Sequence, residues 1–224
     1  MSTLLLRLAA PLQAWGTDSK FETRRTGREP SKSGVVGLLA AALGIRRDGD
    51  LSRLNALRFG VRVDREGCVI RDYHTARSEK AAYITNRYYL SDAVFLVGLE
   101  CGDEAFLCEL SDALNHPAFP LFLGRRACPP TPRLVLGVRS SGLDAALAEE
   151  PWLCGADRPA ARPTQLRIVT ECRATDDLAV RVRDLPLSFD PQRRQYGFRA
   201  SAETLLPFPA PVPGKTEHDP MSEL

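Results

Sequence analysis

The 224-residue sequence predicts an α+β protein with a ferredoxin-like N-terminal domain and a small β-rich C-terminal lobe. Two observations support this prediction. Over residues 1–140, segments with strand or helix periodicity follow the order strand, helix, strand, strand, helix, strand, which is the ferredoxin-like order also used by RNA-recognition modules. After about residue 140, the periodic segments are mainly short strands. An apolar content of 44% is sufficient for a packed core.

The N-terminal domain is expected to contain four buried or half-buried strands and two helices. The strands are predicted at residues 3–9, 57–64, 93–99 and 134–138, and the helices at residues 34–43 and 103–114. Asp103 is a suitable N-cap for the second helix. Residues 68–72 are expected to pair back with 57–64 through a turn at 65–67. The periodicity is then lost, which predicts an inserted loop at about 74–90.

The C-terminal part is expected to form a separate, smaller unit. Residues 141–204 contain a short helix at 143–149 and strands near 166–171 and 179–185. Residues 205–224 form a tail in which Pro207, Pro209, Pro211 and Pro213 favour an extended or disordered chain.

Composition excludes several classes of protein. The formal net charge of +2 excludes a histone-like or polybasic protein, but residues 1–77 hold 14 basic and 8 acidic residues, a net of +6. Of 30 basic residues only 4 are lysine, so 26 are arginine, either because arginine binds phosphate or because the genome is GC-rich. No apolar run approaches the ~18 residues of a membrane span and no signal peptide is evident, so a cytosolic protein is expected. The six scattered cysteines predict free thiols and no metal site.

A first basic cluster precedes the first predicted helix. It consists of Lys20, Arg24, Arg25, Arg28 and Lys32, and it leads into Ser33 and Gly34 at the helix start. Helix N-termini present free N–H groups and a partial positive charge, so this position favours a phosphate. The alternative is a solvated loop with an ordinary helix cap.

A second cluster combines aromatic and basic residues between two predicted strands. Its members are Arg71, Tyr73, His74, Arg77, Lys80, Tyr83, Arg87, Tyr88 and Tyr89. Aromatic rings that stack on bases, beside cations that hold phosphates, are typical of single-stranded RNA binding. The alternative, that the tyrosines simply begin a strand, is equally good for Tyr88 and Tyr89. Weaker basic groups occur at Arg125 and Arg126, and at Arg193, Arg194, Tyr196 and Arg199.

Catalytic signatures are sparse. His74, Tyr73 and Lys80 are candidates for metal-independent RNA cleavage by general acid–base catalysis at the 2′-OH. A histidine that packs or binds RNA is the better interpretation, because no second conventional base is evident. No catalytic residue, metal or cofactor is therefore expected.

Four ordered motifs resemble those of the CasD family. They are LLLRLAAPLQAWG at 4–16, TGREPSKSGVVGLLAAALGIRRD at 26–48, RDYHT at 71–75 and LGRRACP at 123–129. CasD is the subunit of the type I-E CRISPR surveillance complex, Cascade, that holds the 5′ end of the guide RNA. The resemblance implies a ferredoxin-like fold of the repeat-associated RNA-binding superfamily, a thumb at 74–90 and a C-terminal β-rich lobe.

The resemblance also implies a role and partners. The subunit would be non-catalytic, would bind the 5′ handle of the guide RNA, and would contact the Cascade backbone and large subunits, with target DNA reached only through the complex. The implied RNA-facing residues are Arg24, Arg25, Arg28, Lys32, Gly34, Arg71, Tyr73, His74, Arg125 and Arg126. Two alternatives stay open: an endoribonuclease that processes CRISPR repeat RNA, since a related subtype uses a homologue in this way, and an adaptor whose basic loops bind acidic proteins.

Overall fold

A computed structural model describes residues 1–16, 23–77, 82–154 and 163–207 of the chain. Lys20, Lys80 and residues 208–224 of the predicted tail lie outside this range. The strands are β1 (Ser2–Ala9), β2 (Leu12–Gln13), β3 (Thr23–Arg24), β4 (Arg58–Arg65), β5 (Cys68–Arg77), β6 (Ala82–Ser91), β7 (Val94–Cys101), β8 (Val135–Arg139), β9 (Gln165–Glu171), β10 (Val180–Ser188) and β11 (Gln195–Pro207). The helices are α1 (Lys32–Ala42), α2 (Ser52–Asn55), α3 (Glu104–Asn115) and α4 (Leu143–Glu149).

The chain is an α+β protein, as predicted, and its main element is a seven-stranded sheet. The strand order is β10-β11-β9-β4-β7-β1-β8. Its central part, β4-β7-β1-β8, consists of the four strands predicted for the N-terminal domain, and each lies within two residues of its predicted bounds. All the neighbours in this sheet pair antiparallel.

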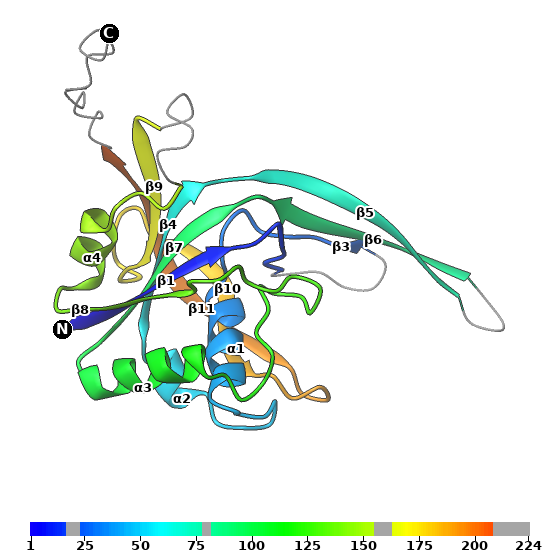
Figure 1. The fold of residues 1–224 in the computed structure, drawn as a ribbon, viewed down its shortest axis with the longest axis horizontal. Helices are drawn as coiled ribbons and strands as arrows, with labels where there is room; N and C mark the ends of the chain where they lie inside the picture. The colour runs from blue at the N-terminus through cyan, green and yellow to red at the C-terminus, as the bar shows by residue number, and fades with distance from the viewer. Residues whose placement is uncertain (17–22, 78–81, 155–162, 208–224) are drawn as a thin grey trace, which may run out of the picture.

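Helices cover both faces of the sheet (Figure 1). On one face, α1 and α3 enclose the larger core with the inward side chains of β1, β4 and β7, because Leu4, Phe59 and Phe95 alternate with residues of the opposite face. On the other face, α4 packs on β1, β4 and β7 and buries Leu143 and Leu147. Asp103 caps α3 as predicted, and its carboxylate accepts from the Phe106 N–H at 3.0 Å.

The inserted segment is a long β-hairpin, not a loop (Figure 1). β5 pairs antiparallel with β6 from Cys68↔Ser91 to Arg77↔Ala82, so the predicted pairing of 68–72 with 57–64 is wrong. Both edges of β4 are occupied, by β7 and β9, and the hairpin therefore leaves the sheet. Its outer part is exposed on both faces, and a strand without a buried face has no hydrophobic alternation to reveal it. Gly67, at φ 70°, allows the turn, since a Cβ there would collide with the Ser91 carbonyl.

The C-terminal strands extend the seven-stranded sheet from the edge of β4. β9 pairs with β4, β11 pairs with β9, and β10 pairs with β11. These strands therefore share one sheet with the N-terminal domain, and the boundary at residue 140 stays a prediction. The sequence does not predict β11, and the last residues of this strand, 205–207, lie in the predicted tail.

In the part of the chain that the structure describes, no helix is both long and apolar enough to span a bilayer.

Candidate nucleic-acid-binding surface

The N-terminus of α1, predicted to hold a phosphate, is already occupied by a carboxylate of the protein. The Lys32 N–H donates to Asp184 Oδ2 at 2.7 Å, and the Gly34 N–H donates to Ser31 Oγ at 3.2 Å. Asp184 comes from β10 and is 1% exposed. Sequence reasoning recognised the anion preference of this helix end but not the internal anion that satisfies it.

Lys32 and Ser33 also differ from their predicted role. The Lys32 ammonium donates to the carbonyls of Asn55 and Leu57 at 2.9 and 2.8 Å and pairs with Glu171 at 2.9 Å. Lys32 is 4% exposed and Ser33 is 9% exposed. Because these groups are buried and the ammonium already has three acceptors, Lys32 is a structural residue and not a phosphate contact.

Arg199 completes this buried ionic cluster. Its guanidinium binds both carboxylate oxygens of Asp184, at 2.7 and 3.0 Å, and lies 3.8 Å from Glu171. The cluster contains two cations and two carboxylates from α1, β9, β10 and β11, and it fixes the helix to the C-terminal strands. The basic–aromatic grouping predicted for Arg199 is therefore wrong, because its side chain faces the interior.

Three arginines do meet at the base of the β5–β6 hairpin. β3 pairs parallel with β6 so that Arg24 lies directly beside Arg87. Arg125, from the loop after α3, donates to the Arg24 carbonyl at 3.0 Å and lies 4.5 Å above the Tyr89 ring. Among the described residues, none of the three guanidiniums has an ion-pair partner, and Arg87 Nε and Arg125 Nη1 are buried without a hydrogen-bond acceptor. We call Arg24, Arg87 and Arg125 the arginine triad.

The loop that carries Arg125 and Arg126 is positioned by close backbone packing. Leu123 and Ala14 share a backbone hydrogen bond of 3.2 Å. Gly124, at φ 84°, packs so closely on the Ala14 carbonyl that a Cβ would overlap it. Arg126 is exposed beside the triad.

The loop between β3 and α1 contains Arg25 and Arg28, both exposed. Arg28 forms a two-oxygen ion pair with Glu66, with both distances 2.9 Å. This charge is therefore partly neutralised, although an ion pair with both partners exposed is weak and can exchange for a phosphate.

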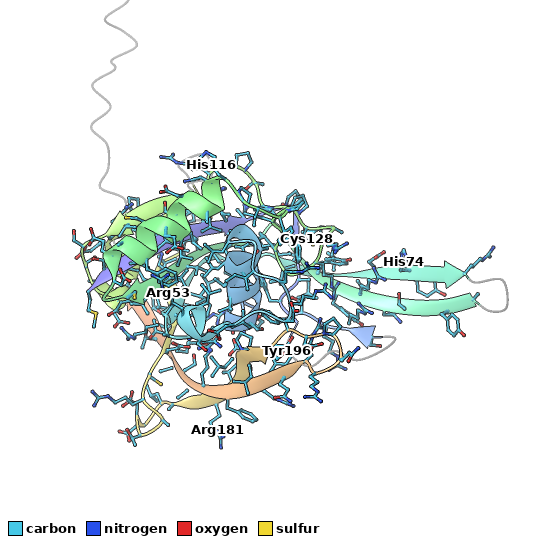
Figure 2. The ribbon with its side chains drawn as sticks, turned by 90° about the horizontal axis from the view of Figure 1, so that it is seen from below. Arg53, His74, His116, Cys128, Arg181 and Tyr196 are labelled. Atoms are coloured by element: carbon cyan, nitrogen blue, oxygen red, sulfur yellow. The ribbon has the colours of Figure 1, made fainter. Side chains whose placement is uncertain are left out.

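The hairpin presents the remaining predicted residues on two opposite faces. Strand alternation and register place Arg71, Tyr73 and Arg77 on one face, and His74, Tyr83 and Arg87 on the other. Tyr73 and Tyr83 are each 60% exposed. Figure 2 shows His74 on the projecting part of the hairpin. Tyr73 and His74 therefore do not converge on one reacting atom, and Lys80 lies outside the described residues.

Within the described ranges, no three potential metal-ligating side chains gather at one point.

The comparisons with known proteins agree with this architecture. A family model described as CRISPR-associated protein (Cas_Cas5) matches residues 3–201. The chain therefore belongs to the CRISPR-associated Cas5 family.

Within this family the resemblance to CasD is confirmed. The chain is 43% identical to the CRISPR system Cascade subunit CasD of Escherichia coli K12, over 61% of this chain and 70% of that protein. It is also similar to a solved structure titled "Crystal structure of Cas protein", with a TM-score of 0.74, 44% identity, and 92% of this chain and 95% of the other covered. A chain from a "CRISPR RNA-guided surveillance complex" gives a TM-score of 0.77 at 37% identity, over 93% of this chain and 91% of that chain.

Proposed function

We propose that this protein is the CasD-type subunit of a type I-E Cascade complex and that it binds the 5′ handle of the guide RNA without cleaving it. Similarity to E. coli CasD and to a chain of an RNA-guided surveillance complex supports the assignment to Cascade. The strand order β4-β7-β1-β8, with α1 and α3 on one face, supports a ferredoxin-like domain of the repeat-associated RNA-binding superfamily. The proposed partners are the backbone and large subunits, with target DNA reached through the complex in the cytoplasm.

The arginine triad is the observation that carries this proposal. Like charges directly opposite each other on neighbouring strands are unfavourable unless an anion lies between them. Arg24 and Arg87 are such a pair, and Arg125 adds a third charge from another segment. An RNA phosphate supplies the missing anion, and Tyr83 and His74 on the same face of the hairpin lie where adjacent bases can stack.

The test is guide-RNA binding by the R24A/R87A double variant across a salt series. The slope of log K against log salt is about −0.7 per neutralised phosphate of a single strand. Loss of the phosphate between Arg24 and Arg87 should therefore make the slope less negative by about 0.7, together with weaker binding. R46A/R47A removes the same charge from exposed positions in the loop after α1 and is the matched control. An unchanged slope in R24A/R87A contradicts the assignment of the handle to the triad.

The non-catalytic role is tested separately. Purified protein incubated with repeat RNA in EDTA should leave the RNA intact, because Tyr73 and His74 lie on opposite faces of the hairpin. A specific product that disappears in the H74A variant would establish the endoribonuclease instead.

A further inference from the structure

The β10–β11 hairpin carries aromatic rings and arginines on a face that is separate from the arginine triad. Tyr196 and Phe198 are two residues apart on β11, so they lie on the same face of the sheet. Arg181 of β10 pairs with Ala200 of β11 and therefore lies on the same face. Its guanidinium is 4.8 Å from the centre of the Phe198 ring. Phe198 is 54% exposed, and Figure 2 shows Arg181 pointing away from the body of the molecule.

The charge of this hairpin is strongly one-sided at its surface. Arg181, Arg183, Arg193 and Arg194 are all exposed, and none has an ion pair with another described residue. Between Val180 and Ala200 the acidic residues are Asp184 and Asp190. Asp184 forms an ion pair with Arg199 in the interior. Asp190 accepts a hydrogen bond from the Gln192 N–H at 2.8 Å inside the turn. Between Val180 and Ala200 the surface therefore presents four arginines against the single carboxylate of Asp190, which keeps its negative charge.

The turn that carries Arg193 and Arg194 is held in place. Phe189 packs against the larger core, and the Arg193 N–H donates to the Asp190 carbonyl at 3.1 Å. These two arginines extend the basic surface from the strands to a turn whose backbone is already ordered, so binding pays no further cost of ordering that backbone.

We propose that this face, defined by Arg181, Arg183, Arg193, Arg194, Tyr196 and Phe198, binds a short single-stranded nucleic acid, independently of the handle site. Adjacent aromatic side chains on an exposed sheet face are the arrangement on which successive unpaired bases stack. A paired duplex keeps its bases covered, so the rings favour a single strand. The arginines bind phosphates, and the Arg181 guanidinium, 4.8 Å from the centre of the Phe198 ring, lies where it can also stack on a base.

The first test measures binding of the full-length protein to a U12 RNA and a dT12 DNA, neither of which contains a repeat handle. F198A/R181A should weaken binding about tenfold or more, as expected from loss of a base stack and a phosphate contact. If bases stack on this ring, F198W should bind about as tightly as the wild type, whereas F198L should lose about as much affinity as F198A. F119A/R46A is the matched control, since Phe119 is 47% exposed elsewhere on the protein.

The second test uses photocrosslinking with thiouridine-containing U12 and peptide mapping. A crosslink in the β10–β11 peptide that persists in R24A/R87A supports the proposal even if handle binding fails. If F198A/R181A weakens binding of both oligonucleotides, the face binds phosphates and bases of either nucleic acid. If it weakens binding of U12 alone, the face is specific for RNA. Unchanged binding of both oligonucleotides by F198A/R181A, or crosslinks confined to the β5–β6 hairpin, would overturn it.

Discussion

Removal of the Asp184 carboxylate tests the assignment of the α1 N-terminus most directly. In the D184A variant, the Lys32 N–H and two N–H groups of Arg199 lose their acceptor. The buried cluster of two cations and two carboxylates then keeps an unbalanced positive charge, because Glu171 is already paired with Lys32. Breaking a buried pair by deleting one partner costs about 3–5 kcal/mol.

The assay is urea unfolding followed by tryptophan fluorescence. Trp15 is 1% exposed and packs against Gly34 in the first turn of α1, so it reports on this region. With a slope of about 2–3 kcal/mol per M urea, D184A should lower the unfolding midpoint by about 1 M or more. D184N keeps an acceptor for the Lys32 N–H and should lose less, about 1–3 kcal/mol.

Two controls separate charge balance from simple loss of contacts. D184A/R199M removes both charges, so it should be more stable than D184A. Sulfate should stabilise D184A more than the wild type at matched ionic strength, because the vacated helix end becomes an anion site. The reasoning is refuted if D184A is as stable as the wild type, or if sulfate stabilises both proteins equally.

Two further predictions concern a glycine and a cysteine. A Cβ on Gly34 would lie 2.8 and 2.9 Å from ring atoms of the buried Trp15, so G34A should lose about 1–3 kcal/mol in the same urea assay. In the control G102A, the nearest heavy atom to the new Cβ is Met1 Sδ at 4.0 Å, so stability should change by less than about 0.5 kcal/mol. Equal losses would contradict this packing. Burial, reinforced by the charge of Asp64, raises the pKa of Cys154 from 9.0 to about 11. Cys154 should therefore react with iodoacetamide at pH 8.5 more slowly than the exposed Cys108, and its rate should rise until the pH passes about 11. Peptide mass spectrometry measures both alkylation rates. Equal rates at pH 8.5 would contradict the raised pKa of Cys154.

The central part of the fold could be predicted from sequence because its signals are local. Strands with one or two buried faces alternate or run continuously apolar, and α3 combines an apolar stripe with an Asp103 cap. The β5–β6 hairpin and β11 could not be found in this way, because much of each is exposed on both faces. Pairing of residues 68–72 was misassigned because no local signal shows that β9 occupies the free edge of β4.

The candidate site was predictable in composition but not in pairing. The basic cluster before α1 and the tyrosine-rich segment were both recognised, and the structure places Arg24 beside Arg87. The carboxylate that occupies the helix end is 152 residues from Lys32 in the sequence. Charge neutralisation over such a separation depends on the completed sheet, so a count of nearby acids could not reveal which cations stay unpaired.

The excess of arginine over lysine, which base composition alone could explain, has a structural use in this protein. Arg62 is buried and donates from three nitrogens to both Asp64 oxygens and to the carbonyls of Leu147, Glu150 and Pro151 at the end of α4. A lysine has three donors on one atom and cannot span these acceptors. Arginines therefore fall into two groups. Some, such as Arg62 and Arg199, bind internal carboxylates, whereas no carboxylate among the described residues pairs with the triad at the hairpin base. Since the fold supplies carboxylates to its buried arginines and no described residue supplies one to the triad, the triad is where we propose that an RNA phosphate binds.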